Sequence, residues 1–249
     1  MTKELTGKVA LVTGGGRGIG AAIARALADA GADVAISYAN SAGPAEQLVT
    51  ELEATGVRAA AFRADQAKVE EATGLIGRVA AQFGKLDILV NNAGVLYWGT
   101  VGEEGEDLAA FDRQLAINYI NVVAAIRAAV PHLGEGGRII SLGSGVSTRV
   151  GATTMTDYAA SKSALVGFSK GLARDLAARG ITVNVVQAGH VDTDMNPADG
   201  PFAAANAATS ALGRYGHPEE IAYGVVALAS PRASYITGAV LPVDGGYLA

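Results

Sequence analysis

Tyr158 and Lys162 stand four residues apart in the stretch Tyr158-Ala159-Ala160-Ser161-Lys162, and their types and spacing suit proton transfer. On a helix, residues four apart share a face, with Cβ atoms about 5 to 6 Å apart. A cation beside a phenol favours the phenolate and lowers the tyrosine pKa from its ordinary value of about 10. We therefore expect Lys162 to make Tyr158 usable as an acid or base near neutral pH. Taken alone, the pair also fits an ordinary exposed helix face. The other motifs of the chain decide between this interpretation and a catalytic pair.

A glycine-rich turn near the amino terminus favours a phosphate site. It is Thr13-Gly14-Gly15-Gly16-Arg17-Gly18-Ile19-Gly20, between a short β-branched run and a segment with apolar residues at helical spacing. The backbone N–H groups and the dipole of a helix N-terminus both attract an anion there. Its spacing, G-x-x-x-G-x-G, differs from the commoner G-x-G-x-x-G of dinucleotide enzymes, and glycine turns also serve plain packing.

The end of the second predicted strand bears on cofactor choice. In an NAD site an acidic residue at this point accepts hydrogen bonds from the ribose hydroxyls. Here the strand ends at Tyr38, with Asn40 and Ser41 following, and Asp33 stands too early. The missing carboxylate leaves room for a 2′-phosphate, which Arg17 can reach from the glycine turn unless it only caps a surface turn. We expect NADP(H) to be preferred, with NAD(H) as the alternative cofactor.

Strand and helix patterns alternate along the whole chain, which predicts a parallel sheet covered on both faces. The expected fold is α/β: a single doubly wound, Rossmann-type domain, residues 1–249, with a seven-stranded parallel sheet flanked by helices. The predicted strands are residues 8–12, 33–38, 58–63, 86–90, 138–142, 181–186 and 239–243. The predicted helices are residues 19–30, 44–55, 69–83, 108–133, 158–179 and 218–229. The irregular connection at about 190–212 is expected to be a substrate lid.

Asparagine occurs at two places where its role is open. Asn91-Asn92-Ala93-Gly94 follows the fourth strand, and its small residues would let a ring lie close to the backbone, although Asn-Asn also caps turns. Asn118 lies in the middle of a helical pattern, where its amide competes for backbone hydrogen bonds. It indicates either a local break or an exposed position.

Composition excludes several classes of function. The net charge of −5 and the lack of a basic cluster argue against nucleic acid or an anionic membrane surface as partners. The chain has no cysteine, which excludes a disulfide framework, a zinc-thiolate site and a thiol nucleophile; no metal is expected. No apolar run is long enough to span a bilayer, and the amino terminus lacks a signal-peptide pattern, so we expect a cytoplasmic protein that acts on small molecules.

Together these motifs resemble the short-chain dehydrogenase/reductase family over essentially the full chain, and its 3-oxoacyl-carrier-protein-reductase-like branch most. The matching residues are Thr13-Gly14, Gly18-Ile19-Gly20, Asp65, Asn91-Asn92-Ala93-Gly94, Asn118, Ser144, Tyr158, Lys162, Gly189, Thr193 and Asp244-Gly245-Gly246. The resemblance implies interconversion of a ketone and a secondary alcohol by hydride transfer, in a homotetramer.

The resemblance also implies residue roles. Tyr158 would be the acid/base, Lys162 would lower its pKa and bind the nicotinamide ribose, Ser144 would bond the substrate carbonyl, and Asn118 would hold a proton-relaying water. The implied cofactor-binding residues are Gly14, Arg17, Gly18, Ile19, Gly20, Tyr38, Asn40, Ser41, Asp65, Gln66, Asn92, Ala93, Gly94, Tyr158, Lys162, Gly189, Val191 and Thr193. The expected pocket residues, which suit a medium-sized, mostly apolar ketone, are Leu96, Tyr97, Trp98, Val146, Thr153, Met155, His190, Met195 and Phe202.

One departure from the family pattern concerns the pocket. The family usually has Pro-Gly after the sixth strand, and this chain has Ala188-Gly189-His190. Alanine loosens the turn that proline fixes, and His190 stands where it could meet substrate or nicotinamide, or only solvent. Other readings are an epimerase, dehydratase or dehalogenase on the same scaffold, and a non-catalytic dinucleotide-sensing protein. The intact glycine pattern speaks against the dehalogenase, and the complete set of four catalytic positions speaks against the sensing protein.

Overall fold

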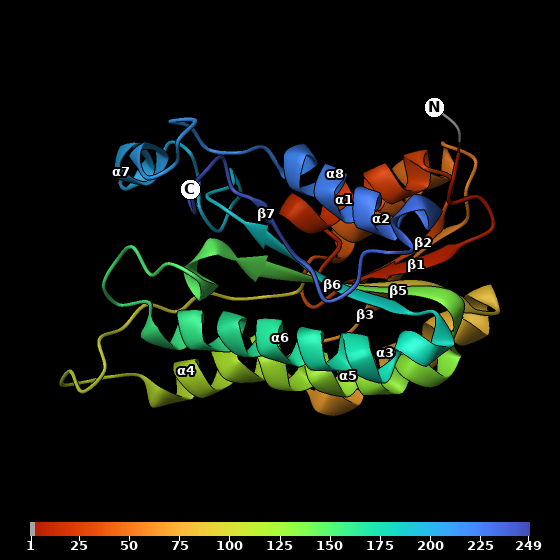
Figure 1. Cartoon of the computed structure of the whole chain (residues 1–249), viewed down its shortest axis with the longest axis horizontal. Coiled ribbons are helices and arrows are strands. Elements are labelled where there is room, and N and C mark those ends of the chain that lie inside the picture. Colours follow the sequence, from red (N-terminus) through yellow and green to blue (C-terminus); the bar gives the residue numbers. More distant parts are fainter. Residues whose placement is uncertain (1–2) are drawn as a thin grey trace.

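The computed structural model describes residues 3–249, and the first two residues of the predicted domain lie outside it. Seven parallel strands form one sheet in the order β3-β2-β1-β4-β5-β6-β7 (Figure 1). The strands are β1 (Val9–Val12), β2 (Asp33–Tyr38), β3 (Ala59–Arg63), β4 (Leu86–Asn91), β5 (Leu133–Ser144), β6 (Thr182–Ala188) and β7 (Val240–Val243). The central strands are buried on both faces, as expected of a parallel sheet with helices on each side. The predicted doubly wound α/β fold is confirmed.

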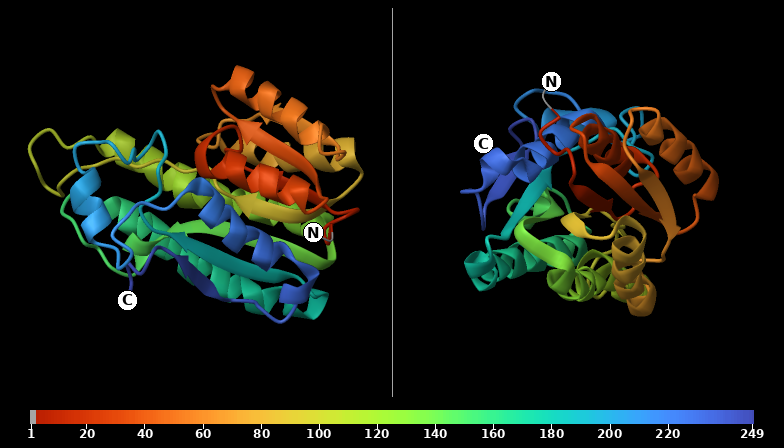
Figure 2. Two further views of the ribbon diagram at one scale, coloured as in Figure 1. Left: turned by 90° about the horizontal axis from the view of Figure 1, so that it is seen from above. Right: turned by 90° about the vertical axis from the view of Figure 1, so that its right-hand side faces the viewer.

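Two layers of helices cover the sheet, and Figure 2 shows it twisted between them. One layer holds α1 (Gly18–Asp29), α2 (Ala42–Glu53) and α8 (Pro218–Ala229). The other holds α3 (Val69–Phe83), α4 (Leu108–Leu115), α5 (Asn121–Ala129) and α6 (Thr156–Asp175). Each layer has its own apolar core, because a sheet buried on both faces must place apolar side chains on both.

The predicted helix over residues 108–133 is wrong in one respect: it is interrupted. A π-helical turn, Ala116–Ile120, separates α4 from α5, and a 3-10 turn, Val130–His132, leads directly into β5. Asn118 lies in the π-helical turn with 1% exposure. Of the two alternatives for Asn118, the local break is therefore confirmed and the exposed position is wrong.

The predicted helix over residues 158–179 begins at Thr156, ends as an α-helix at Asp175, and continues as a 3-10 turn, Ala177–Arg179. Gly180 closes it with φ of 67°, a left-handed conformation that glycine adopts without steric cost. The predicted lid segment contains one short helix, α7 (Ala203–Ala208), within turns. Among residues 3–249, no helix combines the length and hydropathy needed to cross a membrane.

Candidate active site

The site residues gather at the carboxyl ends of the central strands. The strand order reverses between β1 and β4, which are neighbours although β2 and β3 intervene in sequence. In open α/β sheets, ligands bind in the crevice at such a switch point. The glycine turn follows β1 and the Asn91-Asn92 motif follows β4, so both motifs border this crevice.

The glycine turn is packed too closely for side chains. A Cβ atom at Gly20 would overlap the carbonyl oxygen of Gly14, and one at Gly14 would lie 3.0 Å from Ala93 Cα. Gly18 has φ of 51°, which favours glycine. The absence of side chains at these glycines therefore lets a ligand approach the backbone of the turn closely, as a phosphate site requires.

The polar groups after β4 hold this turn in place. Asn92 Nδ2 donates to the carbonyls of Thr13 and Gly14 at 2.9 and 3.1 Å. In return, Thr13 Oγ1 accepts from the backbone N–H groups of Asn92 and Ala93 at 3.0 and 3.1 Å. Asn92 thus acts as a structural tie between the end of β4 and the glycine turn.

The N-terminus of α1 suits an anion. It has no side-chain cap and no acidic residue in its first turn, so side chains leave its first N–H groups free and its dipole uncompensated. Arg17, just before this helix, does not extend freely from the turn. Its Nη1 donates to the carboxylate of Asp194 at 2.9 Å, and both side chains are well exposed.

The adenosine side of the predicted site lies at the ends of β2 and β3. Tyr38 and Ser41 are partly buried there and Asn40 is exposed, while Gly14 N donates to Ser37 Oγ at 3.1 Å. Asp65 is engaged locally: its carboxylate accepts from Ala67 N at 2.9 Å. The neighbouring Gln66 is buried, and its carbonyl accepts from Asn121 Nδ2 at 2.9 Å.

The pair Tyr158 and Lys162 lies in the first turns of α6, facing the end of β5. Lys162 Nζ lies 5.9 Å from the centre of the Tyr158 ring and donates to the carbonyl of Leu142 at 2.9 Å. The hydroxyl of Ser144, the last residue of β5, is close enough to the Tyr158 phenol to lower its pKa. Lys162 is buried, with 6% exposure. The structure thus brings Ser144, Tyr158 and Lys162 together, and the reading of the pair as an exposed helix face is wrong.

The expected direction of the Tyr158 pKa is wrong in this structure. Burial raises the pKa of the phenol, and the hydrogen bond with Ser144 opposes this only in part. Burial also lowers the pKa of Lys162 to about 8, because a low-dielectric site disfavours the ammonium. Loss of hydration is therefore the main cause of both pKa shifts, and the spacing of the two residues alone did not reveal it.

Asn118 lies beside the same site. Its Oδ1 accepts from Val95 N at 2.9 Å, and its Nδ2 donates to Val95 O at 2.9 Å and to Ser161 Oγ at 3.2 Å. A Cβ atom at Gly94 would lie 3.3 Å from Asn118 Oδ1 and 3.5 Å from Lys162 Nζ. The side chain of Asn118 therefore ties the loop after β4 to α6, and Gly94 leaves open space between Asn118 and Lys162.

The segment after β6 closes the other side of the crevice. A Cβ atom at Gly189 would lie 2.7 Å from Asp244 Cα, so glycine is required where the segment passes β7. Thr193 packs against the glycine turn, since its Cγ2 would lie 3.4 Å from a Cβ at Gly18. Val191 is buried. Of the predicted residues of this segment, Thr193 therefore borders the glycine turn, whereas Gly189 borders the residue after β7.

The expected pocket residues divide into three groups: those at one apolar cluster, two partly buried rings, and exposed residues. Val146 and Met155 are buried in one apolar cluster with Ala159, and Leu96 and Tyr158 pack against it. His190 and Tyr97 are partly buried, and the His190 ring lies 5.8 Å from Tyr215 and 5.7 Å from Tyr247. The remaining expected pocket residues, Trp98, Thr153, Met195 and Phe202, are exposed. The first group forms a wall beside Tyr158, and the structure does not bring the exposed residues into it.

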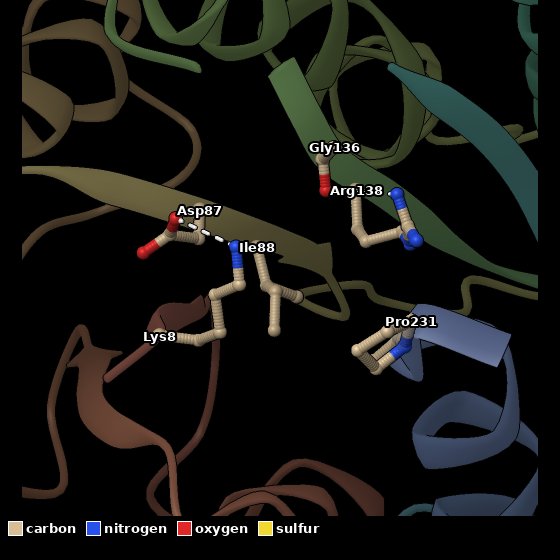
Figure 3. A pocket seen from close by; sticks show the side chains of 7 residues that line it. Lys8, Asp87, Ile88, Gly136, Arg138 and Pro231 are labelled. Atoms are coloured by element: carbon tan, nitrogen blue, oxygen red, sulfur yellow. Dashed lines mark hydrogen bonds and ion pairs between the residues drawn. The ribbon is translucent and has the colours of Figure 1, made fainter. Parts of the chain in front are cut away.

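A separate cavity of about 110 Å³ lies at the opposite end of the sheet (Figure 3). Lys8, Asp87 and Arg138 line it, and Lys8 Nζ pairs with Asp87 Oδ1 at 3.4 Å. Arg138 donates to the carbonyls of Gly136 and Gly137. No predicted site residue lines this cavity, so it is not part of the candidate active site.

Sequence reasoning missed three residues that shape the site. The hydroxyl of Thr13 accepts a hydrogen bond from the loop after β4, whereas the sequence indicated Thr13 only as part of a motif. Asp194 pairs with Arg17, 177 positions away. Gln114 accepts a hydrogen bond from the loop after β4. Gln114 lies four residues before Asn118, and this helical spacing was a signal that could have found it. Nothing in the sequence marks Asp194.

Comparison with known proteins agrees with this geometry. The family model described as enoyl-(acyl carrier protein) reductase matches residues 14–248. The chain is 44% identical over 242 residues to the cyclic-di-GMP-binding biofilm dispersal mediator protein of Escherichia coli, covering 97% of this chain and 98% of that protein. It is 40% identical over 242 residues to the 3-oxoacyl-acyl-carrier-protein reductase of Staphylococcus aureus, covering 96% and 97%.

A crystal structure of a short-chain dehydrogenase from Burkholderia cenocepacia in complex with NADP superimposes with a TM-score of 0.96. It is 50% identical and covers 99% of this chain and 100% of that chain. The predicted resemblance is thereby confirmed. With this match and a family model that spans the glycine turn, the Tyr158 region and the carboxyl end, the chain belongs to the short-chain dehydrogenase/reductase family.

Proposed function

We propose that this oxidoreductase interconverts a ketone and a secondary alcohol by hydride transfer, with NADP(H) as the preferred cofactor and Tyr158 as the acid/base. One observation carries the proposal: a phenol, a hydroxyl and a buried ammonium converge at the carboxyl end of β5. The Ser144 hydroxyl acts on the pKa of the Tyr158 phenol, and Lys162 Nζ lies 5.9 Å from the centre of the Tyr158 ring. These are the groups that a carbonyl oxygen needs when it gains negative charge.

The residues of the crevice fit a dinucleotide. The uncapped N-terminus of α1 would hold the pyrophosphate, Asp65 would lie near the adenine, and Arg17 would hold the 2′-phosphate. Gly94 and Lys162 would face the nicotinamide ribose. When bound, the nicotinamide supplies or accepts the hydride.

In the reduction direction, the hydroxyls of Ser144 and Tyr158 donate hydrogen bonds to the substrate carbonyl oxygen. As hydride transfer builds charge on that oxygen, Tyr158 Oη gives up its proton to it. The raised pKa of Tyr158 keeps the phenol protonated and ready to donate near neutral pH. Lys162 then stabilises the resulting phenolate, since an adjacent cation lowers the cost of the anion.

Leu96, Val146 and Met155 form an apolar wall beside Tyr158, which supports a mostly apolar ketone as substrate. The exposed residues of the predicted lid, Met195 and Phe202, would contribute apolar surface if the segment closes over a ligand. His190 lies between two tyrosine rings at the base of this segment, which limits the directions from which a substrate can approach it.

The non-catalytic alternative is a protein that senses a nucleotide. One relative is named for binding cyclic-di-GMP, which keeps this alternative testable. The presence of Asn118, Ser144, Tyr158 and Lys162 around one crevice favours the enzyme, because sensing requires none of the proton-transfer groups.

The test is the absorbance of reduced nicotinamide while NADPH is mixed with a panel of ketones that includes a 3-oxoacyl ester, an aromatic ketone and a cyclic ketone. The proposal expects turnover of at least one, with defined product chirality. Tight NADPH binding with no turnover of any ketone would contradict it. Displacement of NADPH by cyclic-di-GMP in the same titration would favour the sensor.

A further inference from the structure

One face of the α4 to α5 segment holds the loop after β4 at three successive points. Asn118 bonds both the N–H and the carbonyl of Val95. Gln114 Oε1 accepts from Tyr97 N at 2.7 Å. At the third point, a Cβ atom at Gly99 would overlap the ring of Phe111. Every second residue of the loop, at 95, 97 and 99, is therefore fixed against one helix face.

Gln114 is the unusual member of this set. It is the single buried side chain of α4, with 0% exposure. The N–H of Tyr97 requires an acceptor, which fixes the amide oxygen toward the loop and turns Nε2 away from it. Within residues 3–249, Nε2 has no hydrogen-bond partner. A buried, unpaired N–H costs free energy, so a glutamine at this position contributes the placement of Tyr97 more than stability.

The loop so fixed carries part of the wall beside Tyr158. Leu96, between two fixed residues, packs against the apolar cluster that contains Met155, and Tyr158 packs against the same cluster. The far end of the loop is also held: Gly99 N donates to Thr154 O at 3.1 Å. Thr154 has φ of 65°, which is strained for a β-branched residue, so this end of the wall is held in a costly conformation.

We propose that Gln114 is a positioning residue: by holding Tyr97 N, it keeps Leu96 against the apolar cluster on which Tyr158 also packs, and so sets both the substrate wall and the hydration of the phenol. The predicted effect of Gln114 on catalysis rests on the proposed function. The placement of the loop by Gln114 does not depend on that function. Gln114 touches none of the reacting groups, and its effect passes through the loop.

The first test measures the loop directly in the full chain by hydrogen–deuterium exchange of the amides of residues 94–100. Gln114→Met keeps the length of the side chain and removes the acceptor, so the Tyr97 amide should exchange roughly tenfold faster or more. Gln114→Glu keeps an acceptor oxygen and should restore much of the protection. The matched control is Asn184→Leu. Asn184 is a buried residue of β6, remote from residues 94–100, whose side-chain amide donates to Ile236 O and accepts from Ala239 N.

The two variants should also differ in stability. Gln114→Met removes the unpaired Nε2 group and leaves the N–H of Tyr97 without its acceptor. The number of unpaired donors stays the same, so the Tm of the variant should stay within about 2 °C of the wild type. Asn184→Leu leaves two buried backbone groups unpaired and should lower Tm without changing exchange at residues 94–100. Unchanged exchange of Tyr97 in Gln114→Met would overturn the positioning role.

The second test uses the ketone that the wild type reduces fastest. In Gln114→Met, KM should rise roughly fivefold with a smaller change in kcat, because a displaced Leu96 weakens the wall. The alkaline limb of the pH profile for reduction should move to lower pH, because a better-hydrated Tyr158 loses part of the burial that raises its pKa. An unaltered profile with unaltered KM would overturn the link to catalysis. If the wild type reduces no ketone, the proposed function fails, and the exchange experiment still decides the positioning.

Discussion

Burial governs the acid/base pair at the scale of single residues. Tyr158 and Lys162 are close enough to interact, and the motif indicated that the ammonium would lower the pKa of the phenol. In the structure burial raises the pKa of Tyr158 and lowers that of Lys162 to about 8, so both changes disfavour charge. A phenol that keeps its proton is a donor, which suits the reduction of a ketone. A positive charge on an oxidised nicotinamide would shift the balance toward phenolate and favour the oxidation of an alcohol.

The buried ammonium should reduce the stability of the fold at neutral pH. With a pKa of about 8 in place of 10.5, the native state binds fewer protons than the unfolded state between these values. The free energy of unfolding therefore rises with pH across that interval, and the penalty is fully present below pH 8. Lys162→Met should stabilise the protein at pH 7 by on the order of 2 to 3 kcal/mol, the lost bond to Leu142 O included.

Urea denaturation of the wild type and of Lys162→Met at pH 7 and pH 10 checks the predicted gain in stability. The difference between them should shrink as the pH rises from 7 to 10, because native wild-type Lys162 loses its buried charge above pH 8 while the unfolded state keeps its proton up to about pH 10.5. A difference that stays constant with pH would contradict the account of Lys162.

At the level of helices and strands, the alternation of strand and helix patterns along the sequence predicted the fold class and most elements. It did not predict which side chains make contact between the elements. The bounds of α3 and α8 were predicted as the structure has them, because their apolar periodicity ends at clear signals: Gly84 after α3 and Pro218 at the start of α8. The interruption at Asn118 was one of two open alternatives, because the amide can compete for backbone bonds or face water. Its burial depends on packing against α6, which periodicity does not report.

The contact of the lid segment with the glycine turn was beyond sequence reasoning for the same reason. Asp194 pairs with Arg17 across 177 positions, and Thr193 packs beside Gly18. The proposed 2′-phosphate would replace the Asp194 carboxylate as the partner of Arg17.

Substitution of Arg17 tests this arrangement. Arg17→Ala should lower kcat/KM for NADPH roughly ten- to a hundredfold and affect NADH much less, since a guanidinium–phosphate contact is charge-assisted. Asp194→Asn should leave Arg17 free and improve NADPH more than NADH. Equal efficiencies in the wild type, or equal losses with both cofactors in Arg17→Ala, would mean that Arg17 does not bind the 2′-phosphate.

At the scale of the molecule, exposed apolar side chains lie on both helical layers. Leu115 and Ile120 are exposed on the α4 to α5 side. Tyr223 on α8 is exposed on the other side, and Tyr235 and Ile236 are exposed in the connection that leads to β7. Exposed apolar surface of this kind commonly marks contacts between subunits.

We propose, from the family resemblance, that the chain forms a homotetramer with two kinds of interface and that these two groups of residues lie in them. We expect light scattering at micromolar concentration to give a mass four times that of the chain. Ile120→Lys and Tyr235→Lys should each reduce the tetramer to dimers by removing one of the two interfaces. A monomeric mass for the wild type would contradict this assembly.

The central claim is that Tyr158 moves the proton while the cofactor site works independently of it. The direct measurement is the rate of NADPH oxidation with a reducible ketone in wild type and Tyr158→Phe, beside NADPH affinity by fluorescence titration. The account predicts that Tyr158→Phe loses turnover to the limit of detection, with the loss in kcat, and keeps NADPH affinity within a few fold. Retention of a tenth or more of the wild-type rate, with the same affinity, would contradict it.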